Sequence, residues 1–282
     1  MHYKDNQILE KKNIGENIKS FRIYSPAIAG AALPGQFVIL RLHERGERFP
    51  LTLCNWDKDK GWIQLVVQEV GKSTRELGMM GEGEVIMDIL GPLGKPAEIE
   101  KWGRVICVAG GVGTAEMYPV ARAMQEAGNE VTGIIGFRSE KQVILKEELE
   151  EVMKELFITT EDGSVGIKGL VTDVLQKLLK EGTISLVYSV GPLIMMKVVS
   201  EMTREFAVPT VVSLNPIMVD GTGMCGGCRV KVGDEIKFAC VDGPEFDGHK
   251  VDFTELMVRN KRFQEEEKCA LERFLKGGKD GQ

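Results

Sequence analysis

The stretch that decides the fold is RVICVAGGVGTAEMYP, residues 104–119. It starts as an apolar run typical of a buried strand, turns at closely spaced glycines, and continues into AEMYPVARAMQEAG, where apolar residues recur at helical spacing. A Gly-rich turn between strand and helix lets a pyrophosphate or nicotinamide ribose approach bare backbone at the positive end of the helix. Because the full GxGxxG spacing is missing, a tight turn of any α/β domain explains the stretch equally well.

Outward from this stretch, strand-like and helix-like segments alternate through residues 99–208. Runs such as EVTGIIGF and ISLVYSV are separated by amphipathic segments such as VTDVLQKLLKEG and LIMMKVVSEMTREF. Alternation at these lengths predicts a parallel, doubly wound sheet. Two further junctions, 159–164 and 189–196, would reach the same carboxyl edge of that sheet as 110–114, which predicts a nucleotide site there.

Residues 20–94 follow a different pattern. Short β-rich runs, including PGQFVILRLH, GWIQLVVQEV and EGEVIMDILGPLG, are separated by Gly and Pro and predict an antiparallel barrel or sandwich. Arg48 lies four residues before Thr52, and a guanidinium with a nearby hydroxyl can bind a diphosphate. On this motif alone, an arginine in a surface ion pair at a strand edge is the better explanation. The loop VGKSTREL, 70–77, offers further donors but lacks the spacing of an NTPase P-loop.

The densest group of candidate ligands lies in VDGTGMCGGCRVKVGDEIKFACVDGP, residues 219–244. Cys225 and Cys228 flank two glycines, and Cys240 follows, a pattern of thiolates on a Gly-rich loop typical of an iron–sulfur site. A plant-type loop has another ligand five residues before the first of these cysteines, and that position is Asp220. We therefore predict Asp220, Cys225, Cys228 and Cys240 as ligands. The alternatives are a zinc site, which lacks a fourth cysteine, and three free thiols.

Composition excludes several classes of protein. With 282 residues, 43% hydrophobic and 28% charged, the chain is long enough for two globular domains. A net charge of −6 argues against nucleic-acid binding through a basic face. The sequence contains no leader-like or membrane-spanning apolar run, which predicts a cytoplasmic protein with reduced cysteines and no membrane partner. Mixed apolar and charged residues in 251–275 predict one or two amphipathic helices that pack on the body.

Read in order, the motifs resemble those of the ferredoxin–NADP reductase superfamily. The resemblance covers residues 18–244 and rests on PGQFV (34–38), RFPLT (48–52), GKST (71–74), GPLG (91–94), AGGVGTAEMYP (109–119) and YSVGPLIMM (188–196). The cysteine loop narrows it to the branch that holds the electron-transfer subunit of dihydroorotate dehydrogenase and the small subunit of NADH-dependent reduced ferredoxin:NADP oxidoreductase. An aspartate with three cysteines, rather than four cysteines, favours the second of these.

The resemblance implies a four-part chain that binds FAD, NAD(H) and a 2Fe-2S cluster. Its parts would be a β-barrel FAD domain at 1–98, an α/β NAD domain at 99–208, a cluster region at 209–250 and a helical extension at 251–282. FAD would be bound by Arg48, Pro50, Leu51, Thr52, Gly71, Ser73 and Thr74. NAD(H) would be bound by Gly110, Gly111, Val112, Gly113, Thr114, Glu161, Asp162, Gly163, Gly191 and Pro192. Glu161 and Asp162 favour NADH, whereas Arg138 suits a 2′-phosphate.

The implied function is electron transfer among NAD(H), FAD and the cluster within an electron-bifurcating ferredoxin:NADP oxidoreductase complex. Cofactor chemistry of this kind requires no side-chain acid or base, so no catalytic residue is predicted. The expected partner is a larger flavin and iron–sulfur subunit, through which ferredoxin is reached indirectly. The alternatives are the electron-transfer subunit of dihydroorotate dehydrogenase and a non-catalytic scaffold subunit that retains the fold.

Overall fold

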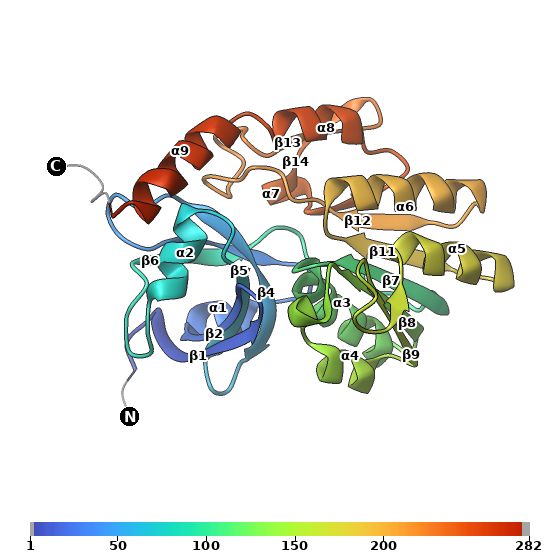
Figure 1. Ribbon diagram of the computed structural model, residues 1–282, viewed down its shortest axis with the longest axis horizontal. Helices are drawn as coiled ribbons and strands as arrows, with labels where there is room; N and C mark the ends of the chain where they lie inside the picture. The colour runs from blue at the N-terminus through green and yellow to red at the C-terminus, as the bar shows by residue number, and fades with distance from the viewer. Residues whose placement is uncertain (1–2, 278–282) are drawn as a thin grey trace.

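The computed structural model describes residues 3–277, which form two large sheets, a hairpin and the helices around them (Figure 1). The N-terminal sheet lies at the left of Figure 1 and the parallel sheet at the right. The C-terminal segment, drawn in orange and red, passes over the top of both. Segments far apart in the sequence therefore meet where the two sheets adjoin.

The N-terminal sheet is an antiparallel barrel of six strands in the order β1-β2-β5-β4-β3-β6. Its elements are β1 (Gln7–Gly15), β2 (Ile18–Tyr24), α1 (Pro26–Ala31), β3 (Phe37–Arg41), β4 (Phe49–Asp57), β5 (Trp62–Gln68), α2 (Lys72–Met79) and β6 (Asp88–Leu93). Alternate residues of β5, namely Ile63, Leu65 and Val67, are buried, as expected for strands with one face inward. A bridge between Gln7 and Val85 joins β1 to the segment before β6.

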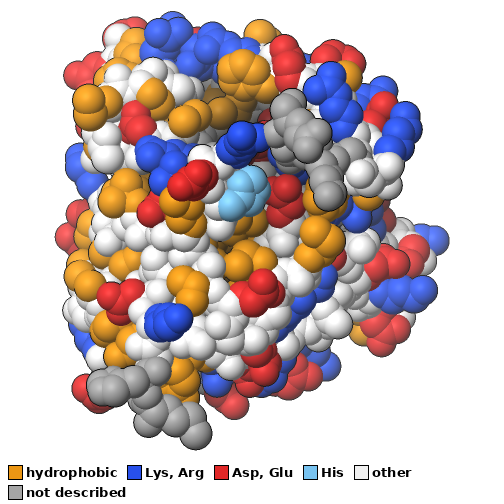
Figure 2. Space-filling view, turned by 90° about the vertical axis from the view of Figure 1, so that its left-hand side faces the viewer, with side chains coloured by type: hydrophobic (Ala, Val, Ile, Leu, Met, Phe, Trp, Pro, Cys, Tyr) orange, Lys and Arg blue, Asp and Glu red, His pale blue; other side chains and the backbone are white. Residues whose placement is uncertain are grey.

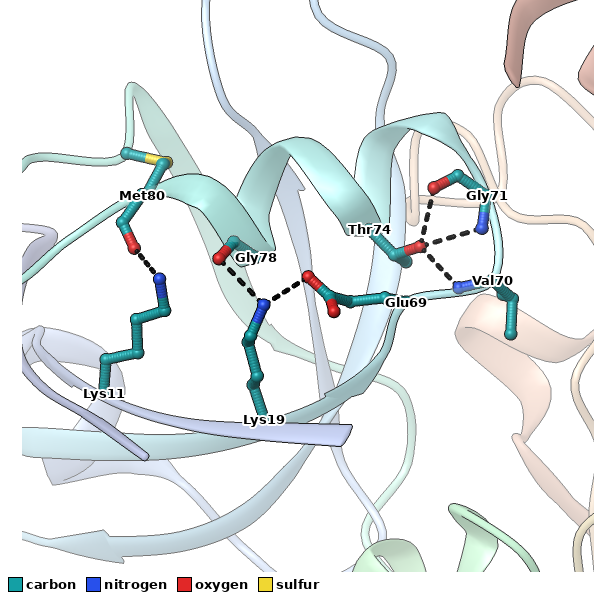
Figure 3. A network of polar contacts seen from close by, with 8 residues as sticks. All are labelled: Lys11, Lys19, Glu69, Val70, Gly71, Thr74, Gly78 and Met80. Atoms are coloured by element: carbon teal, nitrogen blue, oxygen red, sulfur yellow. Dashed lines mark hydrogen bonds and ion pairs between the residues drawn. The ribbon is translucent and has the colours of Figure 1, made fainter. Parts of the chain in front are cut away.

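Helix α2 is fixed to the barrel at its C-terminal end by two lysines from β1 and β2 (Figure 3). Lys19 forms an ion pair with Glu69 and donates to the Gly78 carbonyl at 3.1 Å. Lys11 donates to the Met80 carbonyl at 2.8 Å. Cations at a helix C-terminus satisfy carbonyls that have no partner within the helix. The opposite end of α2 is thereby held in place facing the parallel sheet.

The second sheet has seven strands in the order β10-β9-β8-β7-β11-β12-β15, all parallel except β15. Its strands are β7 (Arg104–Gly110), β8 (Glu130–Phe137), β9 (Glu155–Thr160), β10 (Ile167–Lys168), β11 (Leu186–Val190), β12 (Thr210–Ser213) and β15 (Glu245–Asp247). Its helices are α3 (Gly113–Glu126), η1 (Glu140–Gln142), α4 (Lys146–Val152), α5 (Val171–Glu181) and α6 (Leu193–Glu205). One hydrophobic cluster joins α3 and α4 to one face, and another joins α5 and α6 to the other. The strand order reverses between β7 and β11, where open sheets bind ligands.

The cysteine-containing region is tied to both sheets. Its elements are β13 (Arg229–Val232), β14 (Glu235–Phe238) and α7 (Ala239–Asp242), followed by α8 (Phe253–Arg259) and α9 (Gln264–Leu275). The predicted terminal helices are therefore present within the described residues. A hydrophobic cluster joins Phe37 and Ile39 of the barrel to Met196 of α6 and Cys228 of the loop. The four-part division of the chain stays a prediction; β12 and β15, from the segment predicted as 209–250, pair in the parallel sheet.

The surface mixes charges of both signs with hydrophobic side chains. Figure 2 shows acidic, basic and hydrophobic groups interspersed over the face that it presents. Among the described residues, no helix has the length and apolar character needed to cross a bilayer.

Candidate functional site

A cavity of about 530 Å³ opens at the carboxyl edge of the parallel sheet. Residues from the ends of four parallel strands line it, together with two from the barrel. The lining includes Gln68, Val70, Gly110, Gly111, Gly136, Arg138, Gln142, Glu161, Leu170, Thr172, Pro192 and Met195. This is the edge where the sequence predicted a nucleotide site, and it flanks the reversal of strand order.

Close packing of glycine backbones shapes this cavity. Gly191, at φ +144°, lies so close to Gly110 that an added Cβ would come within 2.9 Å of the Gly110 backbone nitrogen and oxygen. A Cβ on Gly113 would come within 2.9 Å of the Val190 carbonyl oxygen. Side chains are therefore excluded where the loops after β7 and β11 meet, which leaves backbone free to approach a ligand. The next residue, Thr114, is buried and its hydroxyl has no hydrogen-bond partner among the described residues.

The predicted ribose-binding residues divide into two groups. Glu161 is exposed and lines the cavity together with Arg138. Asp162 instead accepts hydrogen bonds from the backbone nitrogen and the hydroxyl of Ser164, at 2.9 and 2.6 Å. These bonds lower the pKa of the Asp162 carboxyl. Gly163, at φ +76°, completes the same turn. The cavity thus presents one carboxylate and one guanidinium, and Asp162 stabilises the turn that follows Glu161.

A second cavity, of about 260 Å³, lies between the barrel and the start of α3. Predicted flavin-binding residues Pro50, Leu51, Thr52 and Thr74 line it, together with Val112 from the glycine turn. Residues 213–216, at and after the end of β12, and Met218 form another wall. Gln68 and Val70 line both cavities, so the two spaces adjoin. A planar ring in the smaller cavity would therefore face a ligand in the larger one.

Three of the predicted phosphate-binding residues, Gly71, Ser73 and Thr74, lie at the beginning of α2. Gly71 precedes the helix, and the Thr74 hydroxyl accepts from the Val70 and Gly71 backbone nitrogens at 3.1 and 3.0 Å (Figure 3). Thr74 thus shapes the turn. The Ser73 hydroxyl donates to the Glu47 carboxylate, which shows that it can bind an anionic oxygen. Arg48 is exposed in the loop before β4.

Sequence reasoning missed Glu116, which lies in the first turn of α3 and lines the smaller cavity. Thr52 hydrogen-bonds its carboxylate, and burial raises its pKa to about 7. Burial disfavours the charged form of a carboxyl, and the single hydrogen bond offsets only part of that effect. The one available signal was an acidic residue directly after the glycine turn, and acids are common there in any helix.

The predicted cluster ligands form two separate pairs: Asp220, Cys225 and Cys228 lie on the loop before β13, and Cys240 lies in α7. The Cys228 and Cys240 sulfurs are 3.2 Å apart, and the Cys240 backbone nitrogen donates to the Cys228 sulfur at 3.4 Å. Burial and the neighbouring thiol raise the pKa of Cys240 to about 12. Asp220 accepts from the backbone nitrogens of Cys225 and Thr222, and its pKa is lowered by hydrogen bonds, the largest effect coming from Cys225. Within residues 3–277, no three His, Cys, Asp or Glu side chains already surround one point.

Arg259 of α8 is a second residue that the sequence did not single out. It is 7% exposed and donates to the Gly227 carbonyl at 3.3 Å, between two of the predicted ligands. Burial lowers the pKa of its guanidinium, followed by repulsion from Arg262 and Arg229. This contact joins residues far apart in the sequence and places a positive charge beside the cysteine loop.

The residues present fit the cofactors that the motifs imply. The larger cavity has the side-chain-free glycine wall that a dinucleotide requires, and an apolar slot for a ring adjoins it. A carboxylate and two thiols lie on the loop before β13 and a third thiol lies in α7, and backbone N–H groups donate to sulfur at Cys225 and Cys228. Amide-to-sulfur hydrogen bonds and thiol donors suit an iron–sulfur cluster.

Comparisons with known proteins agree with this geometry. The oxidoreductase NAD-binding domain matches residues 107–201, and the iron–sulfur cluster binding domain of dihydroorotate dehydrogenase B matches residues 215–252. The chain is 51% identical over 271 residues to the dihydroorotate dehydrogenase B (NAD(+)), electron transfer subunit homolog of Thermotoga maritima, covering 96% of each. It is 35% identical to the probable dihydroorotate dehydrogenase B (NAD(+)), electron transfer subunit of Methanopyrus kandleri, covering 79% of this chain and 82% of that one.

Solved structures give the same result. A chain from the structure of NADH-dependent reduced ferredoxin-NADP oxidoreductase, which was studied for flavin-based electron bifurcation, matches with a TM-score of 0.92 and 50% identity. That match covers 97% of this chain and 99% of the other. Phthalate dioxygenase reductase, at 19% identity and a TM-score of 0.58, shares the fold, covering 80% of this chain and 85% of that one.

In this chain a barrel and a parallel sheet adjoin across two connected cavities, and a cysteine loop lies beside them. This arrangement and the matched structures place the chain among the NAD(H)-dependent flavin iron–sulfur oxidoreductases with the ferredoxin–NADP reductase fold. Within that class, the chain belongs to the family of dihydroorotate dehydrogenase B electron transfer subunits and their homologues. FAD, NAD(H) and a 2Fe-2S cluster are its cofactors. The fold class, family, oxidoreductase role and cofactors predicted from the sequence are confirmed, whereas the individual site residues stay predictions.

Proposed function

We propose that this chain oxidises NADH and passes the electrons singly, through its cluster, to a larger partner subunit that contains flavin and iron–sulfur centres. The observation that supports this most directly is the arrangement of the three sites along one path. The nucleotide cavity adjoins the flavin cavity at Gln68 and Val70, and Met218 in the flavin cavity wall lies two residues before Asp220. Electron transfer among three centres requires this proximity.

When bound, FAD supplies the change from two-electron hydride transfer to one-electron transfer, and the cluster supplies one-electron capacity. The chain's own residues bind and orient. We assign nucleotide binding to Gly110, Gly111, Gly113, Gly191 and Pro192, where bare backbone lies at the beginning of α3. The flavin cavity lies between the barrel and the beginning of α3, so that residues of both border the reacting atoms.

The remaining assignments follow the same logic. Pro50, Leu51 and Thr52 hold the ring by lining the smaller cavity. Gly71, Ser73 and Thr74 lie at the beginning of α2, the side from which a diphosphate would be bound, and the exposed Arg48 is proposed as a further diphosphate ligand. Glu161 favours a free ribose hydroxyl pair and therefore NADH, because a carboxylate repels a 2′-phosphate. Arg138 in the same cavity acts in the opposite sense, so the preference for NADH is modest.

For the cluster we retain Asp220, Cys225, Cys228 and Cys240. Binding would bring the Cys228–Cys240 pair and the Asp220–Cys225 pair to one centre, and it requires the thiols to lose their protons. Positive φ angles at Gly221, Gly223 and Gly226 give this loop conformations that other residues rarely adopt.

The partner in a bifurcating complex would couple NADH, NADPH and ferredoxin. The 50% identity to a chain of NADH-dependent reduced ferredoxin-NADP oxidoreductase supports this candidate. The second candidate is the electron-transfer subunit of dihydroorotate dehydrogenase, which the matched cluster-domain model favours. Helix α9 offers a surface for either partner, because none of its described residues is buried. The cytoplasmic location stays a prediction.

The test is purification of the untagged complex from its native cells, followed by cofactor analysis and anaerobic titration with NADH and NADPH. We expect FAD, two irons and two sulfides on this chain, a larger flavoprotein partner, and flavin bleaching at lower NADH than NADPH. A dihydroorotate-oxidising partner would instead establish the second candidate. A colourless chain, or flavin that neither nucleotide bleaches, would leave only the scaffold alternative.

A further inference from the structure

The proposed function creates a requirement for proton release. NADH donates two electrons together with one hydrogen nucleus as hydride, whereas an iron–sulfur cluster accepts electrons alone. The balanced result is NADH → NAD⁺ + 2e⁻ + H⁺, so one proton must leave the flavin cavity per NADH oxidised. The barrel, α3 and the end of β12 with the segment after it border that cavity, and a side chain that accepts the proton there would speed its release.

Glu116 is the carboxyl side chain that lines the flavin cavity. It comes from the first turn of α3 and is hydrogen-bonded by Thr52, which lines the same cavity from β4. A carboxyl placed only to join α3 to β4 would need no access to a cavity, and a neutral amide would serve equally well. The geometry therefore combines a proton-accepting group, a fixed orientation and contact with the space where the ring would lie.

We propose that Glu116 is the proton-exchanging residue of the flavin cavity and that Thr52 orients it. As the two electrons leave one at a time to the cluster, the N–H bond made by hydride uptake breaks and an O–H bond forms on the Glu116 carboxylate. The resulting carboxylic acid then releases the proton to water. The cofactor is oxidised, the cluster is reduced, and Glu116 returns to its starting state. This inference rests on the proposed function.

The surroundings of Glu116 suit this role. Burial raises its pKa to about 7, so both protonation states are populated near neutral pH, as an efficient acid–base group requires. Tyr188 of β11 lies within electrostatic range of Glu116 and hydrogen-bonds Glu245 of β15. On α3 itself, Arg122 is directed away, toward Asn55 and the Trp56 ring.

Glu245 provides a matched control. Burial raises its pKa to about 7 as well, but it lines a different cavity, of about 700 Å³, bordered by Lys95 and Trp102. Glu116→Gln and Glu245→Gln therefore make the same chemical change in two half-buried carboxyls, of which only one faces the flavin cavity. Glu116→Asp keeps a carboxyl and serves if the glutamine variant binds flavin poorly.

The first measurement is infrared spectroscopy of the FAD-loaded chain in a pH titration, which reports carboxyl protonation independently of turnover. We expect protonated-carboxyl bands that titrate near neutral pH, with a different component lost in each glutamine variant. If Glu116→Gln removed no band from the wild-type spectrum, the inference would be overturned, because Glu116 would then not exchange a proton near neutral pH.

The second measurement separates hydride uptake from electron release by rapid mixing. Flavin bleaching by NADH should proceed at the wild-type rate in Glu116→Gln, while reoxidation by a one-electron acceptor slows by about tenfold or more. The solvent deuterium effect on reoxidation should change in Glu116→Gln and stay unchanged in Glu245→Gln, and Glu116→Asp should recover part of the rate. If the reoxidation rate were the same in the two glutamine variants, the role of Glu116 would be refuted, and the proposed function would stand. Failure of wild-type flavin to bleach would instead refute the proposed function.

Discussion

Glycine at position 191 illustrates how single residues decide the nucleotide site. An alanine Cβ there would meet the Gly110 backbone at 2.9 Å, and φ of +144° is strained for any L side chain. We expect Gly191→Ala to weaken NADH binding by about tenfold or more, equivalent to about 1.4 kcal/mol or more. Titration of flavin bleaching measures this, with FAD content as the internal control. Unchanged NADH affinity would show that the two loops can separate at no cost.

Asp220 allows a ligand to be distinguished from a turn residue. Its carboxylate already accepts hydrogen bonds from Thr222 and Cys225, so a purely local role is visible in the structure. If it binds iron, Asp220→Cys should keep two irons and two sulfides but alter the EPR signal and midpoint potential, because thiolate shares electrons more than carboxylate. Asp220→Asn should alter them too. An unchanged EPR signal in Asp220→Asn would show that Asp220 only shapes the turn, and another fourth ligand would be needed.

At the scale of elements, α2 is positioned by contacts at its C-terminal end. A Cβ on Gly78 would lie 1.7 Å from a Glu69 carboxylate oxygen, the group that pairs with Lys19. Gly78→Ala should therefore displace Glu69, break this partly buried ion pair and lower the free energy of unfolding by about 1–3 kcal/mol, measured by urea denaturation. The control is Gly30→Ala in α1, where an added Cβ meets nothing within 4 Å. Equal stability of the two variants would contradict the account of α2.

Helix α8 supports the cysteine loop through Arg259. Loss of its bond to the Gly227 carbonyl should free the loop between two predicted ligands. We expect Arg259→Ala to lose its cluster to a chelator several-fold faster than wild type, because the hydrogen bond from Arg259 to the Gly227 carbonyl holds the backbone beside the predicted ligands in place. The exposed neighbour Arg262 provides the control variant, Arg262→Ala. The same rate of loss in both variants would remove this role for α8.

Both the single residues and the helices and strands show which features could be predicted from the sequence. The glycine loops after β7 and β11 were predictable, because alternating strands and helices place their carboxyl ends at one edge. The barrel was predictable from short strands separated by Gly and Pro. Glu116 and Arg259 were not, because their partners Thr52 and Gly227 lie far away in sequence and only folding brings them together. The local bonds of Thr74 and Asp162 were equally hidden, since a polar side chain near a turn can face either the ligand or the backbone.

At the scale of the whole molecule, half-buried carboxyls with a raised pKa couple stability to pH. The folded pKa of Glu245 is about 7 rather than its usual 4.5, so the folded state holds its proton more tightly than the unfolded state. Stability from this group is present below pH 4.5 and is lost as pH rises through about 7, a change of about 3 kcal/mol. Glu245→Gln should therefore gain stability relative to wild type between pH 5 and 8. Urea denaturation at several pH values measures this difference, and parallel curves for the two proteins would contradict it.

The shared hydrophobic cluster explains why three cofactor sites lie so close together. Phe37 of the barrel, Met196 of α6 and Cys228 of the loop belong to one cluster, so the sites are parts of one packed structure. Burial of such apolar side chains stabilises the arrangement by about 1.5–3 kcal/mol each. The central claim is that electrons from NADH reach the cluster within this chain.

The most direct measurement is anaerobic EPR spectroscopy of the chain containing FAD and cluster, during stepwise addition of NADH. The account predicts that the signal of a reduced 2Fe-2S cluster grows as the flavin absorbance bleaches, and that Gly191→Ala requires more NADH for the same signal. A cluster that stays oxidised while NADH bleaches the flavin, with dithionite still able to reduce it, would contradict the claim.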